Sequence, residues 1–118
     1  MRLTIVGGGV LGTTHAWEAV QRGHTVVHIE REAEARGATV RNFGLVWVSG
    51  RAGFELDAAL RARELWERLG SMVPGVGFRP AGSLTLLRTP REVAVAEDVA
   101  GRPDAGPRGF EVLDPERV

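Results

Sequence analysis

The sequence contains no cysteine among its 118 residues. This absence excludes a disulfide framework, a thiolate nucleophile and any metal site built on thiolates. The 15 basic and 15 acidic residues cancel, so the net charge gives no support for broad binding to nucleic acid or to an anionic membrane. The three histidines lack metal-ligand spacing, and we therefore expect no metal site.

Long apolar runs are also missing, and none approaches the ~20 residues of a membrane span. Residues 3–11 are apolar after a short basic start, but their glycines do not fit the layout of a secretory signal. We expect a cytoplasmic protein with neither a membrane nor a nucleic acid as its partner.

The chain does have a strand–helix–strand pattern at its start. Leu3–Val6 is short, apolar and β-branched, which predicts a strand buried on both faces of a parallel sheet. A helix is expected from about Val10 to Arg22, closed by Gly23, and Thr25–Ile29 predicts a second strand. The sequence therefore predicts a right-handed βαβ unit and the α/β fold class, with a Rossmann-like parallel sheet.

Glycines lie where the first strand meets this helix, in the pattern G-x-G-x-x-G. Gly7 allows a sharp turn, Gly9 lets a pyrophosphate approach the backbone, and Gly12 lets the helix pack close to the strand. Val10 and Leu11 belong to the helix N-terminus, whose unpaired N–H groups and partial positive charge favour phosphates. The pattern predicts a phosphate-binding turn.

A carboxylate, Glu30, closes the second strand, near the offset of about 20 residues that is typical of this motif. It can accept hydrogen bonds from both hydroxyls of an adenosine ribose, and it would repel the 2′-phosphate of NADP. These features predict a dinucleotide site for FAD or NAD. The alternative is a glycine-rich turn with Glu30 as an ordinary surface carboxylate.

Residues 30–44 are polar and contain glycine, which is typical of a functional loop. The run VGGGVLGTTHAWEAVQRGHTVVHIERE, followed by GATVRNFG, resembles the N-terminus of the flavin-dependent amine and amino-acid oxidoreductases. This group includes D-amino-acid oxidase, glycine oxidase and sarcosine oxidase. ATVRNFG with LVWVSG is most similar to a subgroup associated with phosphonate metabolism. A weaker resemblance extends along most of the chain, through Phe78–Leu86 and Glu111–Asp114.

The resemblance implies FAD as the cofactor, bound by two groups of residues. The group along the phosphates and the adenosine comprises Gly7, Gly9 and Gly12 at the pyrophosphate, Glu30 at the ribose, Arg31 beside the adenine and Thr39 at the diphosphate. The group near the flavin ring comprises Arg41, Asn42 and Gly44. A surface position remains the alternative for Arg41, and turn or capping chemistry the alternative for Thr39.

The resemblance further implies oxidation of a C–N bond in a small-molecule amine or amino acid, and its phosphonate branch suggests an aminophosphonate. No residue presents itself as catalytic, and the oligomeric state is open. Two alternatives remain. One is an NAD-binding dehydrogenase module, which would share the glycines and Glu30. The other is a truncated, non-catalytic remnant.

The resemblance places the FAD-binding part in residues 1–75 and the beginning of a sheet-containing substrate domain in residues 76–118. We expect a helix from about residue 53 to Leu69 that ends at Gly70, and another near Arg91–Val99 started by Thr89 and Pro90. Further strands are expected at 83–88 and 110–113, with a loop at 101–109. The chain looks like the N-terminal portion of a longer enzyme, which would leave strand edges and apolar faces uncovered.

Overall fold

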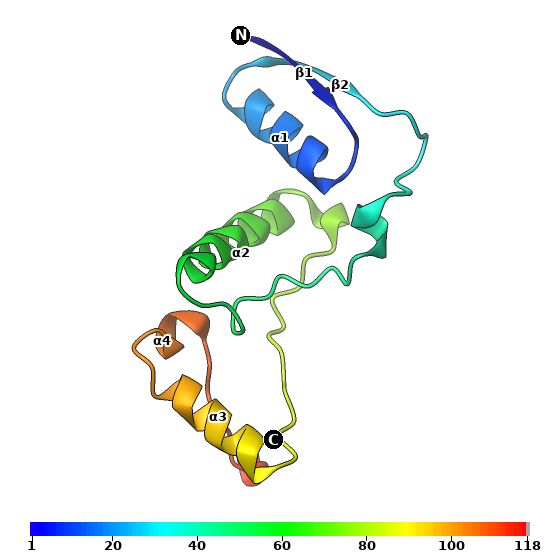
Figure 1. Ribbon diagram of the computed structural model, residues 1–118. Coiled ribbons are helices and arrows are strands. Elements are labelled where there is room, and N and C mark those ends of the chain that lie inside the picture. The colour runs from blue at the N-terminus through cyan, green and yellow to red at the C-terminus, as the bar shows by residue number, and fades with distance from the viewer. Residues whose placement is uncertain (118) are drawn as a thin grey trace. The chain divides into compact units, whose positions relative to one another are not determined.

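The computed structural model describes residues 1–117 of a chain that divides into two compact units, Met1–Leu45 and Val46–Val118. The first unit contains β1 (Arg2–Val6), α1 (Val10–Gln21), β2 (Thr25–Ile29) and the 3₁₀ turn η1 (Ala38–Arg41). Figure 1 shows β1 and β2 side by side, with α1 against one face of the pair. The predicted βαβ unit is confirmed.

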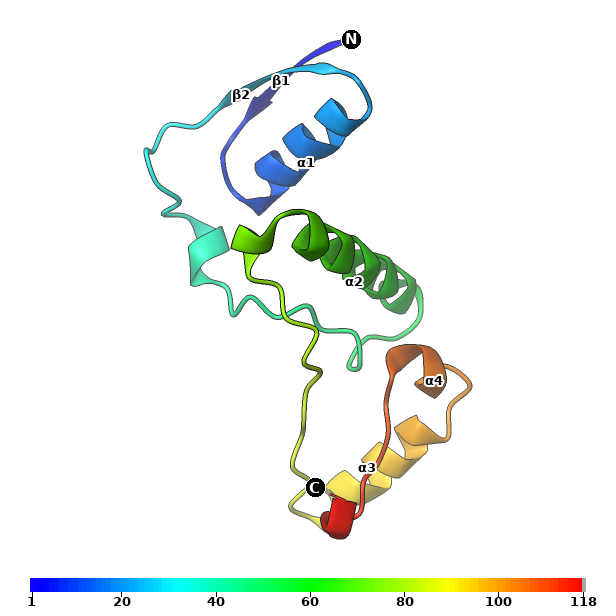
Figure 2. The same cartoon turned by 180° about the vertical axis from the view of Figure 1, so that it is seen from behind.

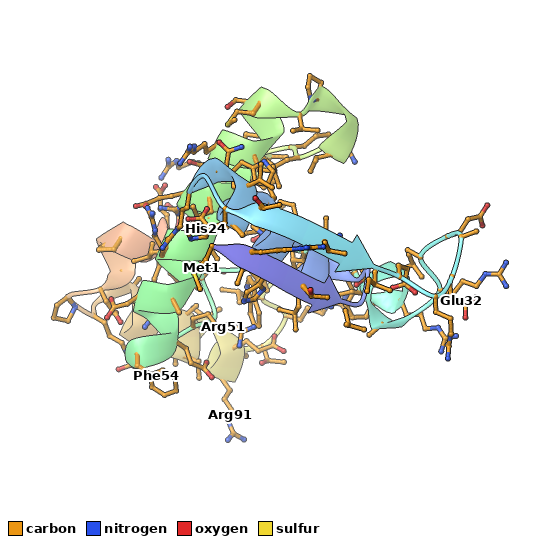
Figure 3. The ribbon with its side chains drawn as sticks, turned by 90° about the horizontal axis from the view of Figure 1, so that it is seen from above. Met1, His24, Glu32, Arg51, Phe54 and Arg91 are labelled. Atoms are coloured by element: carbon orange, nitrogen blue, oxygen red, sulfur yellow. The ribbon has the colours of Figure 1, made fainter. Side chains whose placement is uncertain are left out.

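The two strands run parallel, with Leu3 opposite Val26 and Ile5 opposite His28. Both arrowheads in Figure 3 point the same way, from Met1 and His24 at the start of the strands towards Glu32 beyond their end. Since side chains alternate along a strand, these two pairs share one face of the sheet. Parallel pairing follows from the intervening helix, which returns the chain to the starting edge.

The prediction that β1 is buried on both faces is wrong, because only one of its faces is partly buried within the first unit. Leu3 and Ile5 are half-buried, whereas the alternate residues are exposed, and Val6 is 80% exposed. The reason is that only one face of the strand pair lies against α1, and within the described residues β1 pairs along one edge only. Apolar side chains such as Leu11 and Val20 also remain exposed.

Glycine ends α1 as expected. The N–H groups of Arg22 and Gly23 donate to the carbonyls of Glu18 and Val20, which satisfies acceptors that the last turn would otherwise leave open. Gly23 has a φ of +75°, a left-handed conformation that glycine adopts without a steric cost. The helix therefore stops where the chain must turn into β2.

All regular elements that the structure describes in the second unit are helices or 3₁₀ turns. This unit contains α2 (Phe54–Met72), η2 (Pro74–Val76), α3 (Pro90–Ala100), α4 (Ala105–Arg108) and η3 (Pro115–Arg117), as Figure 2 shows from behind. Thr89 and Glu92 form a reciprocal capping box at the start of α3, which confirms the predicted start. Helix α2 was expected to end at Gly70 but continues to Met72, because a single glycine is tolerated within a helix.

Neither of the additional expected strands is present in the described part of the chain. Residues 83–88 and 110–113 form no ladder, and every residue from 79 to 92 is exposed. A strand exists only through pairing with another strand, and none of the described residues pairs with these segments. The expected loop at 101–109 contains the short helix α4.

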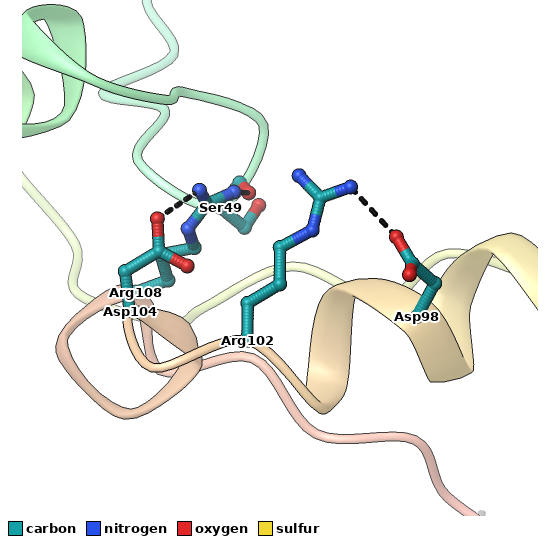
Figure 4. A network of polar contacts seen from close by, with 5 residues as sticks. All are labelled: Ser49, Asp98, Arg102, Asp104 and Arg108. Atoms are coloured by element: carbon teal, nitrogen blue, oxygen red, sulfur yellow. Dashed lines mark hydrogen bonds and ion pairs between the residues drawn. The ribbon is translucent and has the colours of Figure 1, made fainter.

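Helix α4 is attached to the start of the second unit by a buried arginine. Arg108 is 6% exposed, pairs with the carboxylate of Asp104, and donates from Nη1 to the carbonyl oxygen of Ser49 at 3.3 Å. A separate ion pair at 2.6 Å joins Asp98 on α3 to Arg102, which follows the end of that helix (Figure 4). The hydrogen bond from Arg108 joins α4 to the segment around Ser49, and Asp104 supplies the opposite charge that a buried arginine needs.

Gly12→Ala tests the close packing of α1 on β1. A Cβ atom at position 12 would lie 1.8 Å from the carbonyl oxygen of Gly7, so either the helix or the glycine turn must shift. We expect a destabilisation of about 1–3 kcal/mol or more, measured as the free energy of unfolding in urea. Gly37→Ala is the control, because its Cβ would meet nothing within 4 Å. An equally small effect of both substitutions would contradict this packing.

Candidate cofactor site

The candidate site lies at the carboxyl ends of β1 and β2, the edge at which open α/β sheets bind their ligands. The N–H of Gly7 donates to the carbonyl oxygen of Ile29 at 2.8 Å and so continues the ladder by one residue. Gly7 then turns the chain with a φ of +109°, a conformation that side chains rarely adopt. The turn brings the backbone from β1 into the first turn of α1.

Glu30 reaches across this turn from the end of β2. Its Oε2 accepts a hydrogen bond from the N–H of Gly8, and its Oε1 accepts one from the N–H of Glu32 at 2.9 Å. The bonds from Glu32 and from Gly8 hold the pKa of the Glu30 carboxyl below its ordinary value of 4.5. Glu30 is therefore an exposed, ionised carboxylate with a fixed direction.

Thr39 reaches the same turn from η1. Its Oγ1 accepts a hydrogen bond from the N–H of Val10 at 2.9 Å, and a Cβ atom at Gly9 would lie 3.1 Å from this oxygen. Gly9 is the N-cap residue of α1 and has no side chain with which to cap it. The hydroxyl of Thr39 thus supplies the cap from another segment. This is the capping chemistry that the sequence left open as the alternative for Thr39.

The helix N-terminus at this site suits the phosphates of a dinucleotide. Two backbone N–H groups within residues 8–10 point at oxygen atoms of Glu30 and Thr39, and the first turn of α1 contains no acidic residue. The partial positive charge of the helix N-terminus is therefore not offset by its own side chains. Gly12 leaves no side chain between helix and turn, and Leu11 on the first turn is 73% exposed. These residues fit the adenosine diphosphate half of FAD.

Four of the predicted residues are not joined to the glycine turn by a hydrogen bond in the described part of the chain. Arg31 pairs with Glu32 at 3.0 Å, and its side chain is 89% exposed. Asn42 Oδ1 accepts the N–H of Gly44 at 3.2 Å, and the φ of Gly44 is +66°. Arg41 is exposed at the end of η1. Their roles beside adenine and flavin stay predictions.

His28 on β2 also contacts the glycine turn. Its ring is exposed, and Nε2 donates a hydrogen bond to the carbonyl oxygen of Gly7 at 2.7 Å. The sequence contained one signal for this bond. His28 is a polar residue two positions before Glu30, and it alternates onto the same face of the strand as apolar residues. Thr13 was also missed; its Oγ1 donates to the carbonyl oxygen of Gly8 at 3.1 Å.

No group of histidine, cysteine, aspartate or glutamate in residues 1–117 is arranged to hold a metal ion. None of the described helices combines the length and the hydrophobicity that crossing a membrane requires.

Comparison with known proteins places the chain beside flavoenzymes. The family described as FAD dependent oxidoreductase matches residues 2–118. One of the subunits of opine oxidase from Rhizobium meliloti is 31% identical over 106 residues, which cover 82% of this chain and 29% of that protein. D-amino acid dehydrogenase 2 of Mesorhizobium japonicum is 40% identical over 62 residues, which cover 52% of this chain and 15% of that protein. No solved structure is significantly similar.

The lowered pKa of Glu30 predicts a pH-dependent contribution to stability. A carboxyl whose pKa is lowered in the folded state stabilises the fold when the pH is above 4.5, the ordinary pKa of the group. This contribution disappears as the pH falls through the lowered pKa. Melting temperatures of the natural protein and of Glu30→Gln should therefore differ at pH 7 and converge in acid. Glu34→Gln, in the same loop, should change little at either pH. A constant difference between the natural protein and Glu30→Gln would contradict this role.

Proposed function

The chain belongs to the FAD-dependent oxidoreductase family, and on that premise we propose that it binds the adenosine diphosphate half of FAD in an enzyme that oxidises a C–N bond. FAD is the cofactor of this family. The family match thus favours FAD over the NAD-binding alternative. Since the chain spans 29% and 15% of the two relatives' lengths, substrate binding and turnover are proposed for the whole enzyme.

One observation supports this proposal most directly: the glycine turn, the helix N-terminus and a fixed carboxylate meet at one end of the parallel strands. We assign the N–H of Gly9 and the hydroxyl hydrogen of Thr39 to the diphosphate, since the N–H groups of Gly8 and Val10 already donate to Glu30 and to Thr39. Glu30 is assigned to the ribose. A carboxylate oxygen has two lone pairs, so Glu30 can hold Gly8 and still accept a ribose hydroxyl. Bound FAD would supply the capacity to take two electrons from the substrate.

The remaining predicted assignments stay part of the proposal. Arg31 is proposed for the adenine side, and the segment that contains Arg41, Asn42 and Gly44 for the flavin side. The proposed FAD-binding part is residues 1–75, followed by the start of a substrate domain at 76–118. The two compact units divide elsewhere, after Leu45. No residue of this chain is assigned to catalysis, and a cytoplasmic location is likewise proposed.

The substrate is proposed to be an amine or amino acid. Support comes from the two relatives, one named for opines and the other for D-amino acids. An aminophosphonate is a narrower proposal that rests on the resemblance of residues 38–44 alone. The reaction class is common to these candidates, because each has a carbon bonded to nitrogen.

Glu30→Gln tests the proposed cofactor site. A hydrogen bond to a charged group contributes about 1.5–3 kcal/mol, so the loss of the carboxylate charge should weaken FAD binding by roughly tenfold to a hundredfold. Quenching of flavin fluorescence during titration of the full-length protein measures this dissociation constant. Glu34→Gln is the matched control and should bind FAD like the natural protein. Binding of NAD but not FAD by the natural protein would overturn the proposal.

The substrate class is tested by anaerobic reduction of the flavin in the full-length enzyme. Opines, D-amino acids, N-methyl amino acids and aminophosphonates are added one at a time, with the matching 2-hydroxy acids as controls. We expect at least one nitrogen-containing compound to bleach the visible flavin absorbance, because its C–N carbon donates the electrons. Bleaching by the hydroxy acids alone would contradict oxidation of a C–N bond.

A further inference from the structure

Two side chains of the β2 region hold opposite ends of a single peptide group in the glycine turn. His28 Nε2 donates to the carbonyl oxygen of Gly7 at 2.7 Å. The carboxylate of Glu30, two residues further on, accepts the N–H of Gly8. Since the Gly7 carbonyl and the Gly8 N–H belong to the same peptide group, β2 controls both of its polar ends.

The geometry of a peptide group couples these two contacts. The described residues contain no cis peptide bond, so the Gly7 carbonyl and the Gly8 N–H point in opposite directions. A bond that holds the carbonyl on one side therefore directs the N–H to the other side. The flanking glycine, with a φ of +109°, has no side chain to resist rotation of this peptide group. An external contact is needed to keep one orientation.

The position of His28 explains how it reaches the carbonyl. Parallel pairing places His28 opposite Ile5, on the face of the sheet whose β1 residues are half-buried. Its Nε2 would lie 3.4 Å from a Cβ atom at Gly12, so the ring sits between β2 and the first turn of α1. An aliphatic residue at this position could pack there but could not donate a hydrogen bond.

We infer that His28 is a positioning residue for FAD binding: it holds the Gly7 carbonyl so that the Gly8 N–H and the Glu30 carboxylate keep the arrangement that receives the adenosine diphosphate. This inference rests on the proposed function. His28 is hydrogen-bonded to Gly7 and not to Glu30, and in this proposal it acts through the peptide group and does not touch the cofactor. To donate this hydrogen bond, the ring must carry a proton on Nε2. A neutral ring with its proton on Nε2 and a doubly protonated ring both meet this requirement.

A pair of amide substitutions separates hydrogen bonding from packing. The amide nitrogen of His28→Gln corresponds in reach to Nε2, whereas that of His28→Asn corresponds to Nδ1 and stops short of the Gly7 carbonyl. Both side chains are polar and uncharged. His24→Asn is the matched control, because His24 lies at the opposite end of β2 (Figure 3). All variants are made in the full-length protein.

Two measurements are made on each variant. FAD titration should give a dissociation constant about tenfold weaker for His28→Asn, and within about threefold of the natural value for His28→Gln and His24→Asn. Selective ¹⁵N-glycine labelling should show the Gly8 amide resonance displaced in His28→Asn alone. ¹⁵N-histidine labelling of the natural protein should show the proton on Nε2 of His28, which requires no variant to fold.

Equal FAD affinities of the Gln and Asn variants would overturn the inference, as would a neutral His28 ring protonated only on Nδ1. The two proposals fail in different ways. If the natural protein does not bind FAD, the proposed function fails. The Gly8 resonance and the tautomer then still decide whether His28 holds the peptide group.

Discussion

The amino end of α1 approaches the carboxyl end of β1 so closely that a Cβ atom at position 12 would stand 1.8 Å from the carbonyl oxygen of Gly7. This approach places the helix N-terminus directly above the turn, where its partial positive charge acts on whatever lies at the strand ends. It also fixes the direction of the backbone between the strand and the helix. A larger residue at position 12 would separate these two features, and the site depends on their meeting.

The groups that complete the site come from segments outside the turn. Glu30 arrives from β2 and Thr39 from η1, and each accepts a backbone N–H of the turn. His28 holds the carbonyl side of the same backbone. The glycines contribute space and N–H groups, while neighbouring segments contribute oriented oxygen and nitrogen atoms. Preorganisation of this kind lowers the ordering cost that a bound ligand would otherwise incur.

Local signals in the sequence predicted the βαβ unit well. β-branched residues mark both strands, Gly23 marks the end of α1, and Thr89 with Pro90 marks the start of α3, since each acts on its own neighbourhood. The contacts of His28 and Thr39 could not be predicted in this way, because they join residues 21 and 29 positions apart and depend on strand register and on the path of a loop. The expected strands at 83–88 and 110–113 failed for a related reason. Their residues suit a strand, but pairing requires a partner that composition does not reveal.

A crystal structure of the full-length protein with FAD tests the dinucleotide site most directly. The diphosphate oxygens should lie within hydrogen-bonding distance of the Gly9 N–H and the Thr39 hydroxyl at the first turn of α1, and the adenosine ribose should rest on the Glu30 carboxylate. A diphosphate bound away from the first turn of α1, with Glu30 far from the ribose, would contradict the role assigned to this end of the sheet.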